Sequence, residues 1–81
     1  MKRIETFEEL KVLASQDDLI DCFIMFDGGL RSSKQLEYDV DRDEWYVFNE
    51  IDGEEQFLST DDLAEETNII EALNKGNLYL Y

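Results

Sequence analysis

The side chains with the clearest chemical potential are carboxylates concentrated in one part of the chain. Of the 21 Asp and Glu residues, thirteen lie between positions 37 and 66, where Arg42 is the only cation. That segment therefore carries 13 − 1 = 12 excess negative charges, out of a net charge of −14. A field of this kind attracts cations over a distance and repels like charge. Its natural counterpart is a positively charged surface, and the commonest such surfaces bind nucleic acid.

The residue types that are missing exclude several kinds of site. The chain has no His and a single Cys, Cys22. A zinc site of Cys and His ligands, an intramolecular disulfide and the Ser-His-Asp or Cys-His catalytic arrangements are therefore excluded. Among the acids, only Asp21 and Asp27 border a segment apolar enough to suggest a buried or capping carboxylate. Without a recognisable acid–base pair we expect no catalytic residue and no cofactor.

A glycine pair followed by Ser and Lys superficially resembles a phosphate-binding loop. The segment 28–34 reads GGLRSSK, lacks the GxxxxGK[ST] spacing and precedes no helix signal. We interpret it as a turn that runs into a polar strand. Arg31 and Lys34 have two possible uses, which are pairing with nearby acids within the fold and contact with a partner.

A run of alternating acids invites comparison with a calcium loop. Asp39, Asp41 and Asp43 stand at alternate positions, as at the start of an EF-hand loop, and Glu50 falls at position twelve. Position six requires glycine but holds Glu44, and the apolar run after it has strand character. We interpret the match as coincidental and expect no dedicated metal site.

Helix and strand signals describe the scaffold that must hold these acids. Thr6 followed by Glu9 is a capping-box pattern ahead of a helix over 7–15, which ends at Gln16-Asp17-Asp18. Strands are expected over 19–26, from Leu36 onward, over 45–51 and over 55–58, because apolar residues alternate or run together there. Turns are expected at 27–29, 41–44 and 52–53.

The C-terminal third reads as helical. Ser59 or Thr60 caps one short helix, and Asn68 caps a second helix that Gly76 ends. Leu78–Tyr81 is either a terminal strand or an extended tail. Because 43% of residues are hydrophobic and patterned, we expect one folded domain over 1–81 rather than disorder. The predicted fold class is α+β, with an antiparallel meander of three or four strands, an N-terminal helix and one or two short C-terminal helices.

The second strand predicts how some of the acids are arranged. Glu37, Asp39 and Asp41 would point to one face, and Leu36, Tyr38 and Val40 to the other. Alternate residues of a strand lie about 6.6 Å apart, so the acids would form a regular row. Turn acids would extend it at the hairpin ends, namely Asp43, Glu44, Asp52, Glu54 and Glu55. DNA presents negative charge at a similarly regular interval.

Three segments resemble a group of small, uncharacterised proteins of phages and mobile elements. They are FIMFDGGLRSSK at 23–34, NEIDG at 49–53 and TNIIEALNKG at 67–76, about half of the chain. This resemblance implies no activity and no site residues. In charge and size the chain is also similar to acidic DNA-mimic inhibitors of restriction or CRISPR enzymes.

We therefore expect a non-enzymatic inhibitor that occupies the nucleic-acid-binding surface of a basic protein, a bacterial defence enzyme. Tyr46 would be an aromatic anchor at the centre of the contact or would simply pack in the sheet. The expected partner-binding residues are Glu37, Asp39, Asp41, Asp43, Glu44, Tyr46, Glu54 and Glu55.

Three other functions stay open. The main alternative is an acidic adaptor or immunity protein that binds one basic partner without mimicking nucleic acid. A metal-binding or catalytic domain is another, and a protein that self-associates through Leu78–Tyr81 is the third.

The N-terminal sequence and the longest apolar run bear on location. Met1-Lys2-Arg3 is followed by acidic residues rather than an apolar export segment, and the run Cys22–Phe26 is too short to span a bilayer. We expect a cytoplasmic monomer or homodimer with a reduced Cys22, which binds neither nucleic acid directly nor membranes.

Overall fold

The computed structural model describes residues 1–16, 18–29 and 31–81, and for Asp27 only the backbone. The expected helix break at Asp17 and the question of a buried Asp27 carboxylate therefore lie outside the described residues, as does Leu30 of the glycine-rich loop.

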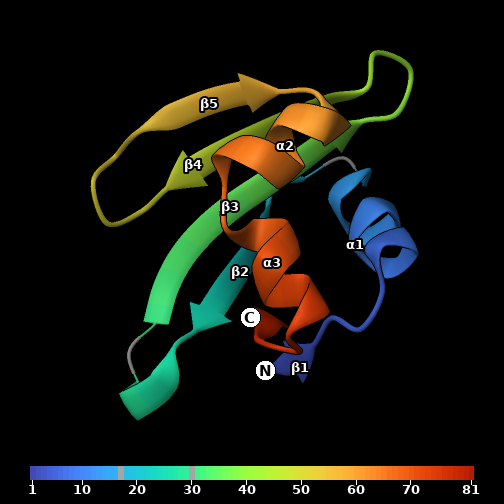
Figure 1. The fold of residues 1–81 in the computed structure, drawn as a ribbon. Helices are drawn as coiled ribbons and strands as arrows, with labels where there is room; N and C mark the ends of the chain where they lie inside the picture. The colour runs from blue at the N-terminus through green and yellow to red at the C-terminus, as the bar shows by residue number, and fades with distance from the viewer. Residues whose placement is uncertain (17, 30) are drawn as a thin grey trace.

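The described residues form a six-stranded antiparallel sheet with three α-helices packed on one of its faces (Figure 1). The strand order is β1-β6-β2-β3-β4-β5. The strands are β1 (Lys2–Arg3), β2 (Ile20–Met25), β3 (Arg31–Asp39), β4 (Glu44–Asn49), β5 (Glu55–Leu58) and β6 (Leu78–Leu80). The helices are α1 (Phe7–Ala14), α2 (Thr60–Glu66) and α3 (Ile69–Asn74), with a short 3₁₀ turn at Asp27–Gly29.

The expected α+β class and the meander of β2, β3, β4 and β5 are confirmed, but the number of strands was wrong. β6 lies between β1 and β2, where Leu78 pairs with Ile24 and Leu80 with Lys2. The C-terminus is therefore a strand and not a tail. The two-residue strand β1 was missed because so short a segment has no periodicity, and its pairing partner comes from the other end of the chain.

Two of the three expected helix caps are confirmed. Thr6 accepts a hydrogen bond from the Glu9 backbone N–H at 3.1 Å, and Ser59 accepts one from Asp62 at 3.2 Å. Asn68 makes no side-chain cap bond. Instead the Thr67 hydroxyl accepts from the Ile69 N–H at 3.3 Å, so the residue before the predicted cap satisfies this helix end.

The core lies between the sheet and the helices and is centred on Trp45. Its side chain is 0% exposed, stacks on Tyr38 at 4.3 Å between ring centroids, and donates from Nε1 to Thr60 Oγ1 at 3.0 Å. Cys22 is also buried, and burial raises the pKa of its thiol to about 12. This thiol is thus protonated and shielded at neutral pH, as a core residue.

Two expectations about individual side chains in the sheet were wrong. Val40 was predicted to share a strand face with Leu36 and Tyr38, but β3 ends at Asp39 and Val40 is 63% exposed. Asp21 was considered for a buried carboxylate, but it is exposed and accepts a hydrogen bond from Gln35 Nε2 at 3.1 Å. For Val40 the error concerns where the strand ends, and for Asp21 it concerns whether that position of β2 is covered.

Candidate partner-binding face

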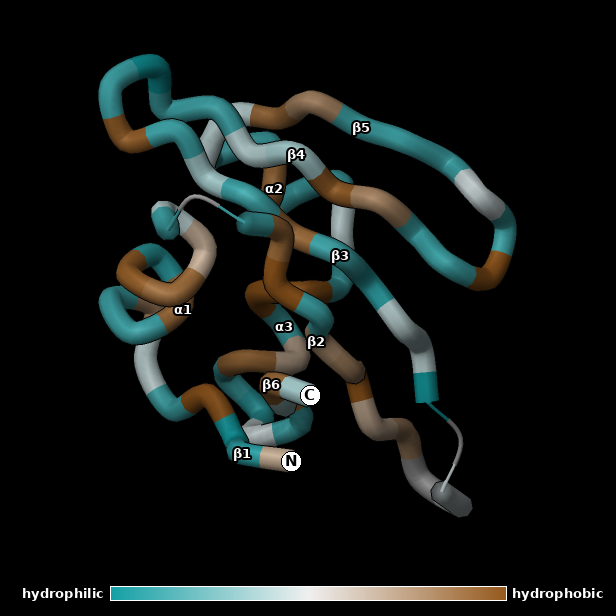
Figure 2. The backbone as a smooth tube through the Cα atoms, turned by 180° about the vertical axis from the view of Figure 1, so that it is seen from behind, coloured by the Kyte–Doolittle hydropathy of each residue, from teal (hydrophilic) through white to brown (hydrophobic). Residues whose placement is uncertain are grey.

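One face of the sheet is left uncovered by the three helices. Alternate residues of a strand point to opposite faces, and Leu36, Trp45 and Leu58 are buried beneath the helices. The residues between them therefore project from the other side, which we call the open face. It carries Glu37 and Asp39 of β3, Glu44, Tyr46 and Phe48 of β4, and Glu55 and Phe57 of β5. Figure 2, seen from behind, shows the strands in front of the helices, with hydrophilic stretches along β3 and β5.

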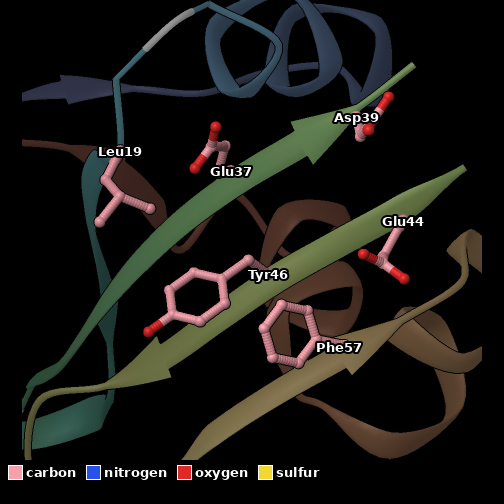
Figure 3. Close-up of a pocket in the computed structure, with 6 residues that line it drawn as sticks. All are labelled: Leu19, Glu37, Asp39, Glu44, Tyr46 and Phe57. Atoms are coloured by element: carbon pink, nitrogen blue, oxygen red, sulfur yellow. The ribbon is translucent and has the colours of Figure 1, made fainter. Parts of the chain in front are cut away.

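Cross-strand pairing brings acids and aromatic rings together on the open face. Asp39 lies opposite Glu44, Glu37 opposite Tyr46, and Tyr46 opposite Phe57. These residues, with Leu19, line a shallow depression of about 360 Å³, which we call the acidic hollow (Figure 3). The rings of Tyr46 and Phe57 lie side by side, 5.2 Å apart between centroids and inclined at 57°.

The carboxylates of the acidic hollow differ in their compensation from within the protein. Asp39 accepts hydrogen bonds from the backbone N–H groups of Asp41 and Arg42, at 3.1 and 3.3 Å. Arg42 approaches Asp39 at 3.9 Å, an exposed pair of a kind that contributes about 0–1 kcal/mol. In the described part of the chain, neither Glu37 nor Glu44 forms an ion pair. Partial burial and then the nearby Glu55 carboxylate raise the pKa of the Tyr46 phenol. This phenol thus stays a hydrogen-bond donor at neutral pH.

The structure groups some of the predicted contact residues and separates others. Glu37, Asp39, Glu44 and Tyr46 meet in the acidic hollow, and Glu55 lies on the same face. Asp41 lies in the exposed turn between β3 and β4, and Glu54 in the connection between β4 and β5 at the opposite end of the strands (Figure 1). The predicted row therefore has two strand members, Glu37 and Asp39, because β3 ends before Asp41.

Asp43 has a structural role in the fold. Its φ of 49° lies in the left-handed region that Asp tolerates better than most residues. Its carboxylate accepts hydrogen bonds from the Thr60 hydroxyl and from Tyr38 Oη, the latter at 3.0 Å. Since Thr60 also accepts from Trp45, this network ties the β3–β4 turn to the start of α2 and to the core. We therefore leave Asp43 out of the candidate contact.

Replacing Asp43 with Asn will lower the melting temperature, whereas Asp41→Asn will not. Both substitutions remove one negative charge, but only Asp43 accepts hydrogen bonds from Tyr38 and Thr60. The Thr60 hydroxyl, and then Tyr38, hold the pKa of Asp43 below its usual value. A carboxyl whose pKa is lower in the folded than in the unfolded protein stabilises the fold at pH values above the unfolded-state pKa of about 3.9. This stabilisation is lost as the pH falls through the folded-state pKa.

Thermal unfolding of the wild type and both variants checks this prediction. The deficit of Asp43→Asn at pH 7 should shrink as the pH is lowered from about 4 toward 2. Equal melting temperatures for the two variants at pH 7 would contradict the structural role of Asp43.

The remaining acids of the 37–66 segment surround the same half of the molecule without lining the acidic hollow. Glu50, Asp52 and Glu54 lie in or beside the β4–β5 connection, where the Asp52 carboxylate accepts from the Glu54 N–H at 2.9 Å. Four others belong to α2, on the helical side of the sheet: Asp61, Asp62, Glu65 and Glu66. The negative field thus covers the β3–β5 half of the protein, and the open face is one part of it.

The two cations of the glycine-rich segment differ in their surroundings. Lys34 is partly buried, and this burial lowers the pKa of its ammonium group below the usual value. The nearby Asp52 charge opposes the shift but does not cancel it. Arg31 lies on the opposite face of the strand, with its guanidinium carbon 4.7 Å from the centroid of the Phe23 ring. Arg31 therefore belongs to the open face.

Sequence reasoning missed Leu19 and Phe57 as members of the hollow. Phe57 is 63% exposed, which its apolar character did not suggest. A partial signal was present, because a hairpin centred on Asp52-Gly53 would set Phe57 opposite Phe48, on the same face as Tyr46. The observed register is centred one residue earlier and pairs Phe57 with Tyr46. Leu19 precedes β2 and reaches the hollow only through the tertiary fold.

The described residues contain neither a metal-ligand cluster nor a membrane-spanning helix. No group of three or more Cys, Asp or Glu side chains there converges in a way that could hold a metal ion. None of the described helices has the length and apolarity needed to cross a membrane.

Comparisons with known proteins add no relative to this description. No known protein family, curated protein or solved structure matches the chain.

Proposed function

We propose that this chain is a non-enzymatic acidic inhibitor that binds, through its open face, the nucleic-acid-binding surface of a basic protein. The observation that carries the proposal is the acidic hollow, where Glu37, Asp39 and Glu44 line one depression of an uncovered sheet face, and where Arg42 is the one cation paired with them among the described residues. Concentrating like charge destabilises a fold through self-repulsion, so an arrangement of this kind is best explained by use of the field. A cationic cleft would supply the missing counter-charge.

The proposed target is a bacterial defence enzyme that acts on DNA or RNA. We propose that the two proteins bind each other in the cytoplasm. Support comes from the similarity in charge and size to inhibitors of restriction and CRISPR enzymes. A net charge of −14 on 81 residues would speed association with a cationic cleft, and this attraction weakens as salt rises.

The second candidate is an acidic adaptor that binds a basic protein without imitating nucleic acid. The Tyr46–Phe57 pair favours this alternative, because an exposed Phe57 ring beside the half-buried Tyr46 ring offers apolar contact that charge mimicry does not need. The two candidates share the contact surface and differ in competition with nucleic acid.

A capture experiment with a competition step tests the proposal. The tagged chain is immobilised and exposed to nuclease-treated bacterial lysate at low and high salt, and each bound protein is then purified. Under the inhibitor proposal, duplex DNA or guide RNA displaces the chain from its partner, and one equivalent of chain blocks the partner's nucleic-acid binding. A partner that holds nucleic acid and the chain at the same time would support the adaptor and overturn the inhibitor.

A further inference from the structure

The open face contains one place where the protein supplies its own arginine to an aromatic ring. The guanidinium carbon of Arg31 lies 4.7 Å from the centroid of the Phe23 ring. The surrounding depression is lined by acids as well, Asp21 and Glu50, together with Tyr81. A guanidinium in this position stacks its flat surface on the aromatic ring, and the flanking carboxylates balance its positive charge.

The acidic hollow has rings and carboxylates as well, but no arginine among the described residues lies over its rings. Tyr46 and Phe57 provide two neighbouring rings, and Glu37 and Glu44 provide carboxylates around them (Figure 3). Within the described residues, the one ion pair made by a lining carboxylate is that of Arg42 with Asp39, at 3.9 Å. The side chain of Arg42 is 79% exposed, so it does not fill the hollow.

We propose that the acidic hollow binds an arginine side chain of the basic partner, an inference that rests on the proposed function and specifies its central contact. The guanidinium would stack on Tyr46 or Phe57 and donate hydrogen bonds to Glu37 and Glu44. Its planar fork matches carboxylates on two strands, and it loses less hydration than an ammonium when it stacks.

Size and charge together select this occupant. At about 360 Å³ the hollow is at the lower end of the range for ligand pockets, so it suits one protruding side chain better than a larger ligand. A lysine would be attracted by the same negative charge, but its ammonium group cannot stack flat on the two aromatic rings as a guanidinium does. A second copy of this chain would bring further negative charge to an already negative face and is disfavoured for that reason.

Two peptides of equal length and charge test the preference for arginine. Acetylated and amidated hexa-arginine and hexa-lysine are titrated into the full chain at moderate salt by calorimetry. We expect hexa-arginine to bind about 5- to 10-fold more tightly, the range of a partly desolvated cation–aromatic contact. The preference should disappear in Tyr46→Leu/Phe57→Leu, while the affinity for hexa-lysine should change little.

A matched control uses another exposed phenylalanine. Phe26 is 45% exposed and lies outside the acidic hollow, so Phe26→Leu should keep the full preference for hexa-arginine. Equal affinities for the two peptides, no binding of either, or a preference that survives in Tyr46→Leu/Phe57→Leu would each overturn the inference. Such a result leaves the proposed function standing if the partner still competes with nucleic acid. If the partner does not compete, the inhibitor proposal fails whichever peptide binds better.

Discussion

Replacing Trp45 with alanine will remove most of the free energy of unfolding. The Trp45 side chain is fully buried, stacks on Tyr38 and donates a hydrogen bond to the Thr60 hydroxyl. Its removal therefore leaves a large cavity and takes from Thr60 the hydrogen bond that Trp45 donates. Truncations of buried Trp or Phe to Ala cost about 3–5 kcal/mol. A domain of 81 residues has roughly 4–12 kcal/mol in total at about 0.05–0.15 kcal/mol per residue, and self-repulsion favours the lower part of that range.

Two readouts check this loss of stability. Urea unfolding followed by far-UV circular dichroism gives the free energy, and Cys22 gives an independent measure, because a thiol buried in the folded state reacts only after opening. The matched control is Phe57→Ala, which removes an aromatic side chain from the exposed face and should cost far less. If the urea concentration at the unfolding midpoint were nearly the same for Trp45→Ala and the wild type, the core would not be centred on Trp45.

Short-range sequence signals were enough to predict most of the elements. The β5 range of 55–58 and the starts of α1 and α2 follow from alternation, turn glycines and capping hydroxyls, all of which act within a few residues. The pairing of β1 with β6 joins the two ends of the chain and leaves no local pattern. The largest error, the strand count, therefore came from contacts that only the complete sheet creates.

The candidate site shows the same division at the level of single residues. Glu37 and Asp39 share a face because of strand alternation, which the sequence contains. The role of Asp43 depends on Thr60, seventeen positions away, and exposure of Phe57 depends on the absence of a helix over that face. Charge alone could not distinguish Asp43, which supports the fold, from Glu44, which lies one residue later in the hollow.

Neutralising the three carboxylates of the acidic hollow will weaken binding to the captured partner by about 100-fold. Close charge pairs in an interface contribute about 1 kcal/mol or more each, and the three losses together give roughly 3 kcal/mol. The variant Glu37→Gln/Asp39→Asn/Glu44→Gln changes the net charge from −14 to −11, since three negative charges are removed. Its affinity should also depend less steeply on salt, because fewer ionic contacts remain to be screened.

The decisive control removes three charges from the other side of the same molecule. Asp61→Asn/Glu65→Gln/Glu66→Gln also has a net charge of −11, but its substitutions lie on exposed positions of α2, away from the open face. If only the overall field mattered, both triple variants would lose affinity equally. Contact through the open face requires the α2 variant to stay within about threefold of the wild type, since long-range attraction alone changes little with three of fourteen charges. Calorimetry or surface binding at several salt concentrations measures both, and equal losses would remove the acidic hollow from the contact.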